Sequence, residues 1–363
     1  MSTRARLYAS IGIPLLLIIV VVGAFMWQQH AASTGTTGPT QPVSGSVCSS
    51  LKSSASQPLT TMRLALDWTP NTNHTGIYVA LNQGWYRAEG IDLQLLPYSA
   101  NVSPDVLVSS GKADVGVGFT EGIVDDAAVN QPVVSIAAIA QHNTSALVTL
   151  ASSGLTRPRD LDGKIYGGFG TAYEGPVVGE VIKNDGGKGQ FKNVTLNVDA
   201  MQALESHRID FVWVYQGWEV IQAQRDGIKL NVFPITSYGI PDYYTPNLIT
   251  SPAEIQQKPA LLHKFMTATS CGYEYARTHP HEAAQMLINA AKSAFPDPGL
   301  VFASQAYLSP RYVDPGRKWG MQDAAVWHGY PQFIINTGGV ADASGKPIHS
   351  LNIDALYTNQ FLM

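Results

Sequence analysis

Residues 62–95 read MRLALDWTPNTNHTGIYVALNQGWYRAEGIDLQL, and they contain the strongest secondary-structure signals of the chain. The segments 62–66 and 91–95 have the residue types of strands, and the segment 76–82 between them has helical spacing. A strand, a helix and a second strand in this order are typical of an α/β unit with parallel strands. We therefore predict an α/β fold that begins near residue 62.

The same alternation continues along the chain without a detectable repeat. Further strands are predicted at 113–117, 133–139, 146–150, 164–166, 194–198, 211–214, 230–233 and 248–250. Further helices are predicted at 105–110, 121–129, 175–183, 259–277, 281–291 and 323–335. The pattern becomes mostly helical after residue 250, so the chain is expected to return there to the part of the fold where it began.

This return predicts two lobes of mixed sheet joined by two crossings of the chain. Lobe I is predicted to comprise 62–145 and 251–363, and lobe II to comprise 146–250. Two crossings are the layout of bilobed binding proteins, in which the ligand lies between lobes that close by a hinge motion.

The segment before residue 62 differs in composition from the rest. Residues 11–27 read IGIPLLLIIVVVGAFMW, about long enough at 1.5 Å per residue to cross a bilayer. Arg4 and Arg6 precede it, which favours an extracytoplasmic location for everything that follows. We predict a membrane anchor at 1–30, with a cleavable signal peptide as the alternative. Residues 31–61 are rich in Ser, Thr, Gly and Pro and are predicted to be a flexible linker.

Composition excludes several functional classes. The chain of 363 residues is 45% hydrophobic with a formal net charge of −4, and it has no Lys/Arg block that would indicate a nucleic-acid partner. Its two cysteines, Cys48 and Cys271, form no CxxC metal motif, and nothing in their spacing favours a disulfide between them. The nine histidines show no HExxH pattern, and His74 has no acidic partner of evident purpose nearby in the sequence. We predict no catalytic residue, no metal and no cofactor, and a monomer.

Polar and aromatic residues follow several predicted strands, at the sheet edge where ligands bind in open α/β folds. Trp68, Asn71 and His74 follow the first strand, with Asn73 a candidate helix N-cap. Trp68 is predicted to bind ligand, the alternative being a core position. Glu121 follows a later strand, and the run 141–143 (QHN) supplies Asn143 after the apolar strand 133–139.

The run 167–176 (GGFGTAYEGP) joins a strand to a helix and lacks the GK[ST] ending of a phosphate loop. Its glycines are expected to let backbone amides approach a ligand, with Glu174 available near the helix N-terminus. The alternative is that Glu174 only compensates the helix dipole.

Large aromatic side chains gather at two later strand ends. Trp213 and Tyr215 lie in the run 211–219 (FVWVYQGWE), and Tyr244 lies in the run 242–244 (DYY). Such density suits a flat ring stacked between lobes. For Trp213, which alternates with Phe211, a core position is an equal alternative.

From about residue 62 to residue 330 the chain resembles the thiamine-pyrimidine and riboflavin branch of the periplasmic binding-protein superfamily, a group related to the fungal pyrimidine synthases. The matching motifs include LDWTPNTNHTGIYVA, PVVSIAAIAQHNTSA, DFVWVYQGWE and DYYTPNLIT. The resemblance implies a type II binding-protein fold, a cleft ligand held by aromatic rings and a carboxylate, and an ABC importer permease as partner. The motif positions it assigns to the cleft are Trp68, Asn71, His74, Asn143, Glu174, Trp213 and Tyr244.

One departure from the family separates binding from synthesis. The fungal synthases carry a cysteine-rich segment about where this chain has DYYTPNLIT, and this chain has no cysteine there. The sequence thus predicts a binding protein for a formylated or hydroxymethylated aminopyrimidine. Riboflavin is the alternative ligand, and a pyrimidine-synthesising enzyme is the alternative of another class.

Overall fold

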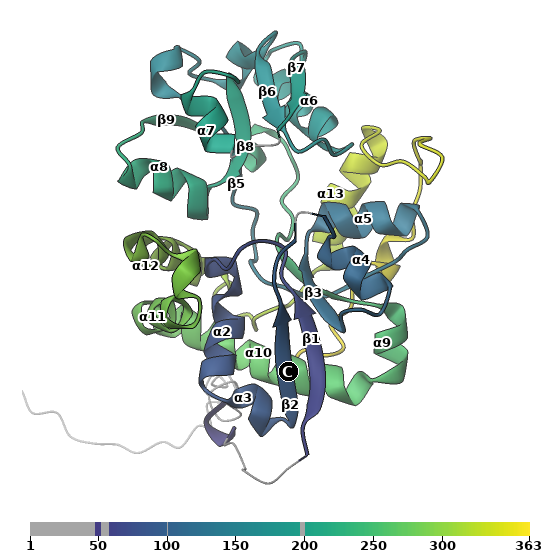
Figure 1. Cartoon of the computed structure of the whole chain (residues 1–363). Helices are drawn as coiled ribbons and strands as arrows, with labels where there is room; N and C mark the ends of the chain where they lie inside the picture. Colours follow the sequence, from purple (N-terminus) through teal and green to yellow (C-terminus); the bar gives the residue numbers. More distant parts are fainter. Residues whose placement is uncertain (1–47, 52–57, 100, 197–199) are drawn as a thin grey trace, which may run out of the picture. The chain divides into compact units, whose positions relative to one another are not determined.

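The computed structural model describes residues 48–51, 58–99, 101–196 and 200–363. The predicted anchor at 1–30 and most of the predicted linker lie outside these residues. No helix in the described part of the chain is long and apolar enough to cross a membrane. The described residues form one compact unit with two five-stranded sheets (Figure 1).

The first sheet has the strand order β2-β1-β3-β10-β4. Its strands are β1 (Thr60–Ala65), β2 (Ile91–Leu96), β3 (Val115–Gly118), β4 (Val134–Ala138) and β10 (Asn247–Thr250). β1 pairs in parallel with β2 and β3, whereas β10 runs antiparallel between β3 and β4. Every residue of β4 is buried, as the apolar run 133–139 predicted.

The second sheet has the order β7-β6-β8-β5-β9. Its strands are β5 (Ser145–Leu150), β6 (Ile165–Gly168), β7 (Lys192–Thr195), β8 (Phe211–Tyr215) and β9 (Leu230–Pro234). β6 is parallel to β7 and β8, and β5 is antiparallel to β8 and β9. Both sheets are therefore mixed, each with one strand of reversed direction inside a parallel set.

Helices surround both sheets (Figure 1). The α-helices are α2 (Thr75–Asn82), α3 (Trp85–Ala88), α4 (Pro104–Ser109), α5 (Thr120–Ala128), α6 (Glu174–Asn184), α7 (Ala200–Glu205), α8 (Ile221–Arg225), α9 (Pro252–Gln257), α10 (Pro259–Thr278), α11 (Pro280–Ala290), α12 (Pro298–Leu308) and α13 (Ala324–Asn336). Short helices are η1 (Thr72–His74), η2 (Ala151–Ser153), η3 (Pro158–Leu161), η4 (Gln216–Val220), η5 (Ile235–Tyr238), η6 (Lys292–Ala294), η7 (Ser309–Arg311) and η8 (Ile353–Ala355). The pattern missed α12 because apolar residues cover most of its circumference, so no amphipathic period shows.

The chain passes between the sheets twice. The first crossover, residues 139–144, links β4 to β5, and the second crossover, residues 235–246, links β9 to β10. The backbone N–H of Ile139 donates to Pro246 O over 3.0 Å, so the two crossovers run side by side. The predicted lobe limits stay a prediction, with one correction. The sequence predicts residues 248–250 in lobe II, but β10 pairs with β3 and β4 of the first sheet. The pattern of a four-residue strand does not indicate which sheet it joins.

Cys48 and Cys271 form a disulfide, contrary to the view that nothing favoured one. Cys271 is buried within α10, and Cys48 begins a helical turn at 48–50. The bond joins residues 223 positions apart, a proximity that only the tertiary structure creates. The predicted linker is thus fixed to the fold at residue 48.

Candidate ligand-binding site

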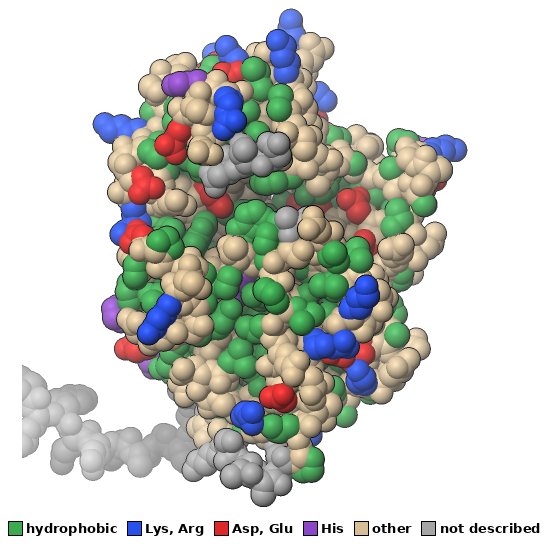
Figure 2. Space-filling view, in the orientation of Figure 1, with side chains coloured by type: hydrophobic (Ala, Val, Ile, Leu, Met, Phe, Trp, Pro, Cys, Tyr) green, Lys and Arg blue, Asp and Glu red, His purple; other side chains and the backbone are tan. Residues whose placement is uncertain are grey.

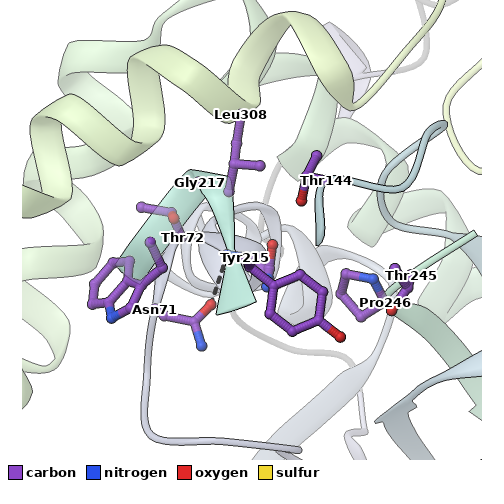
Figure 3. Close-up of a pocket in the computed structure, with 10 residues that line it drawn as sticks. Asn71, Thr72, Thr144, Tyr215, Gly217, Thr245, Pro246 and Leu308 are labelled. Atoms are coloured by element: carbon purple, nitrogen blue, oxygen red, sulfur yellow. Dashed lines mark hydrogen bonds between the residues drawn. The ribbon is translucent and has the colours of Figure 1, made fainter. Parts of the chain in front are cut away.

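A pocket lies where the first-sheet loops, the crossovers and the end of β8 meet (Figure 3). Its lining residues are Asn71, Thr72, Asn73, Thr144, Tyr215, Gly217, Trp218, Thr245, Pro246 and Leu308. The cavity has a volume of about 20 Å³, enough for a water molecule rather than an aromatic ring. Figure 2 shows that the face around it is hollowed and lined largely by hydrophobic side chains. This pocket, in the conformation described, is too small for an aromatic ring.

The loop after β1 is held by a buried His–Asp pair. His74 Nε2 lies 2.7 Å from Asp67 Oδ1, and His74 Nδ1 accepts the backbone N–H of Asn71 over 3.2 Å. Because Nδ1 accepts a hydrogen bond, Nε2 carries the hydrogen and donates a hydrogen bond to the Asp67 carboxylate. The view that His74 has no local acidic partner is wrong: Asp67 is that partner, seven residues earlier. The geometry gives His74 a loop-holding role.

The Asn71 and Asn73 roles also differ from the prediction. Asn71, rather than Asn73, is the N-cap of η1, and its Oδ1 accepts the backbone N–H of Asn73 over 2.9 Å. Asn71 nevertheless lines the pocket. Trp68 is 46% exposed and contacts Tyr98 with ring centroids 4.8 Å apart, so it is not a core residue and its indole is open to a ligand.

Glu174 is engaged by its own loop. Its carboxylate accepts hydrogen bonds from the Tyr166 hydroxyl and from the backbone N–H groups of residues 169–171, over 2.9–3.1 Å. Two carboxylate oxygens have about four acceptor positions, so these donors use nearly all of them. The backbone N–H groups of residues 169–171 in the glycine-rich run already donate to Glu174, so they are not free to bind a ligand. The structure thus favours a structural role for Glu174 at the start of α6, and its predicted ligand contact remains untested.

Glu121 is the carboxylate with the greater free capacity. It is only 4% exposed, and among the described residues one hydroxyl, that of Tyr330, donates to it with good geometry, over 3.0 Å. Tyr243 stacks on Tyr330 with centroids 3.6 Å apart, and the Tyr243 hydroxyl lies beside the carboxylate without a well-formed hydrogen bond. Burial raises the pKa of Glu121, partly offset by these hydroxyls. The backbone N–H of Glu121 itself also contributes, so three donors approach about four acceptor positions, and a buried carboxylate with spare acceptor capacity is typical of a functional site.

Tyr215 and Trp213 lie on one face of β8, toward this cluster. Tyr215 lines the pocket, and its ring lies between Asn71 and Pro246 in Figure 3. Burial raises its pKa, and the charge of Glu121 raises it further, so the two groups are electrostatically coupled. Trp213 is 8% exposed and packs edge-on against Tyr173, with the ring centroids 6.4 Å apart. In this conformation Trp213 therefore occupies a core position, the alternative that the sequence left open.

Two other residues of the predicted site lie in the crossovers. Tyr244 is buried, and its hydroxyl accepts the backbone N–H of Asp323 over 2.9 Å. Asn143 Oδ1 accepts from the backbone N–H and the hydroxyl of Ser145, which leaves the buried Nδ2 without a hydrogen bond among the described residues. That amide remains available to a ligand at the start of β5.

The sequence missed the two rings nearest to Glu121. Tyr243 lies in the aromatic run 242–244, of which the sequence predicts only Tyr244 at the site, and Tyr330 lies inside α13 among other apolar residues. No sequence signal distinguishes a tyrosine facing a carboxylate from one that faces the core. Within the described ranges, no three His, Cys, Asp or Glu side chains are placed to hold a metal ion.

Comparison with family models gives one match, described as NMT1/THI5 like, over residues 71–283. That range is more than half of the chain. The protein belongs to the NMT1/THI5-like family. The matched range includes Glu121, Glu174 and Tyr215, whereas Trp68 lies just before it.

Relatives in this family include binding proteins and synthases. A formylaminopyrimidine-binding protein of Halalkalibacterium halodurans is 26% identical over 284 residues, covering 77% of this chain and 86% of the relative. A 4-amino-5-hydroxymethyl-2-methylpyrimidine phosphate synthase of Legionella pneumophila is 26% identical over 231 residues, covering 62% of this chain and 72% of the relative.

Among solved structures, the alkanesulfonate-binding protein SsuA of Xanthomonas axonopodis, bound to MOPS, superposes with a TM-score of 0.64. It covers 84% of this chain and 99% of that chain at 13% identity, a likeness that establishes the fold alone. The protein thus has the mixed two-sheet fold of periplasmic binding proteins, as the sequence predicted.

Proposed function

We propose that this protein is the extracytoplasmic substrate-binding component of an ABC importer and binds an aminopyrimidine precursor of thiamine. The observation that supports this most is the buried Glu121 carboxylate, which faces the phenol rings of Tyr243 and Tyr330 and has acceptor capacity for a further donor. An aromatic amino group would supply that donor, and the rings would stack on its heterocycle. The formylaminopyrimidine-binding relative supports the same ligand class.

A binding role is favoured over synthesis. Glu121 and its tyrosines form an acceptor for a polar ring, and the cysteine-rich segment expected of the fungal synthases is absent from the sequence. The Cys48–Cys271 disulfide supports an oxidising, extracytoplasmic location. We propose that residues 11–27 anchor the chain at the membrane, that a permease receives the ligand, and that the protein acts as a monomer.

The test is calorimetric titration of the full chain with 4-amino-5-hydroxymethyl-2-methylpyrimidine and its N-formyl analogue. Glu121→Gln keeps the shape of the side chain but removes its charge, and we expect it to weaken binding by about 1.5–3 kcal/mol. Glu180→Gln, on the outer part of α6, is the matched control and should leave affinity unchanged. Equal affinity of the Glu121 variant and the parent would show that the site is misplaced.

A second variant distinguishes the role of Glu174 from that of Glu121. Glu174→Gln removes acceptors from the loop at 169–171, so we expect a lower unfolding temperature with a smaller loss of affinity than Glu121→Gln causes. The reverse order would restore Glu174 as the ligand contact. Binding of riboflavin without binding of either pyrimidine would support a ligand site in the cleft but show that the ligand is a flavin. Catalytic release of a pyrimidine would show that the protein is an enzyme rather than a binding protein.

A further inference from the structure

His142 bridges two carboxylates at the junction of the crossovers. Its Nδ1 lies 2.5 Å from Asp242 Oδ2, and its Nε2 lies 3.1 Å from Asp314 Oδ1. His142 belongs to the first crossover and Asp242 to the second. Asp314 lies in the segment 312–320, which follows η7. A single imidazole thus connects three separate parts of the chain.

The bridge requires a protonated imidazole. An ionised carboxylate only accepts hydrogen bonds, so both ring nitrogens of His142 must donate, and only the imidazolium has two N–H groups. Asp242 cannot turn away easily, because its Oδ1 accepts the backbone N–H groups of Asn143 over 2.9 Å and Tyr243 over 3.0 Å. Loss of the proton would leave one nitrogen facing a carboxylate with no hydrogen between them.

The segment that carries Asp314 is attached to the first sheet. The backbone N–H of Ala138, the last residue of β4, donates to Gly320 O over 3.0 Å, and the Trp319 indole N–H donates to Ile139 O over 3.2 Å. The His142 bridge therefore ties both crossovers to a part of the first sheet. A rotation of the sheets about the crossovers would strain or break it.

The conformation that contains this bridge is a closed one. The loop after α13 packs against the start of α6, where a Cβ on Gly339 would lie 3.1 Å from Tyr173 Cα. α13 packs against α5 of the first sheet, whereas α6 packs in the second. Contacts that hold the crossovers in this arrangement favour closure.

We propose that His142 is a proton-dependent clamp on the crossovers, which stabilises the closed arrangement of the two sheets while it bridges Asp242 and Asp314. His142 is a positioning residue, because it acts on the ligand through the crossovers rather than by contact. The predicted effect of His142 on affinity rests on the proposed function, in which the ligand binds between the sheets. The predicted effect of His142 on the arrangement of the sheets is independent of that function.

The electrostatic surroundings set the direction of the pH dependence. Partial burial lowers the pKa of His142, but the hydrogen bonds and charges of Asp242 and Asp314 outweigh it, so the pKa is raised overall. The nearby Arg317 is paired with Asp323, and the Tyr244 hydroxyl faces the Asp323 backbone. A raised pKa means that the clamp is complete at low pH and is lost as the pH rises through that pKa.

The ligand-free test is a distance between the sheets measured by pulsed electron paramagnetic resonance on the full chain. Spin labels on Lys112→Cys and Lys188→Cys, both exposed, report one sheet each, and the native cysteines are already joined to each other. We expect the distance distribution of the parent to change between about pH 5 and about pH 8. His142→Gln should show the high-pH distribution at both values, and His328→Gln, an exposed histidine paired with Asp354, should behave as the parent.

The binding test uses 4-amino-5-hydroxymethyl-2-methylpyrimidine. We expect its affinity for the parent to fall about tenfold over the same pH range, and the fall to vanish in His142→Gln. Asp314→Asn removes one charge but keeps an acceptor, so the midpoint should move to lower pH, which a purely structural role would not produce. An unchanged distance distribution in the parent, or the same pH response in His142→Gln, would refute the clamp. A pH-dependent distance without any pyrimidine binding would support the clamp and refute the proposed ligand.

Discussion

Asp105, on the first turn of α4, is a buried carboxylic acid without a full set of hydrogen bonds. Its Oδ1 has no partner among the described residues, and it fits there because Gly118 and Gly122 have no side chains, a Cβ on either lying 3.1–3.4 Å away. Burial raises the pKa of Asp105 to about 6, and the charge of Asp67 raises it as well. Burial likewise raises the pKa of Asp125 and of Asp126 to about 7.

This raised pKa predicts that Asp105 lowers the free energy of unfolding in a pH-dependent way. Between about pH 4 and about pH 6 the folded chain keeps a proton on Asp105 that the unfolded chain loses, so stability falls as the pH rises. Asp105→Asn should therefore increase the free energy of unfolding by roughly 2 kcal/mol near pH 8 and by little near pH 4. Urea unfolding at both pH values measures this, with Asp92→Asn, at a half-buried position of β2, as control. An equal change at both values would contradict the assignment.

At the scale of elements, α2 and α10 pack with their backbones in contact. A Cβ on Gly272 of α10 would overlap the carbonyl oxygen of Gly76 in α2, and a Cβ on Gly76 would enter the Tyr273 ring. Only glycine at both positions allows the helices to approach this closely. The pair holds α2, and with it the loop that carries Asn71, against the longest helix of the fold.

Gly272→Ala is therefore expected to lower the free energy of unfolding by about 3 kcal/mol, because backbone atoms of α2 must move away. Gly175→Ala, in α6, is the matched control: its Cβ would meet nothing within 4 Å, so the change should be near neutral or slightly stabilising. Urea unfolding of both variants gives the comparison. A Gly272 variant as stable as the parent would show that the helices are further apart.

At the scale of the whole molecule, the Cys48–Cys271 disulfide closes most of the chain into one loop. The double variant Cys48→Ser, Cys271→Ser should be less stable by about 2–5 kcal/mol, since its unfolded chain is no longer constrained. Thermal unfolding with and without dithiothreitol tests this, and the reductant should not affect the double variant. Two titratable thiols in the denatured, unreduced parent would exclude the bond.

Local pattern was sufficient for the order of most strands and longer helices. Alternation and apolar runs predicted β1, β2, β4 and β8 to within about two residues, because burial on a sheet face depends on neighbours only two positions away. The strand ends also pointed to Tyr215, which lines the pocket beside the crossovers, whereas its predicted ligand contact and that of Glu121 stay predictions. The family motifs in the sequence also predicted the fold class.

Pairing between distant residues was decided only by the tertiary structure. The sequence did not show that β10 joins the first sheet, that Cys48 meets Cys271, or that Tyr330 faces Glu121, 209 residues away. It also favoured Glu174 over Glu121 as the carboxylate that meets the ligand. The fold distinguishes them, because a carboxylate's role depends on how many donors the folded chain already presents to it, and those donors come from segments whose spacing in the sequence carries no signal.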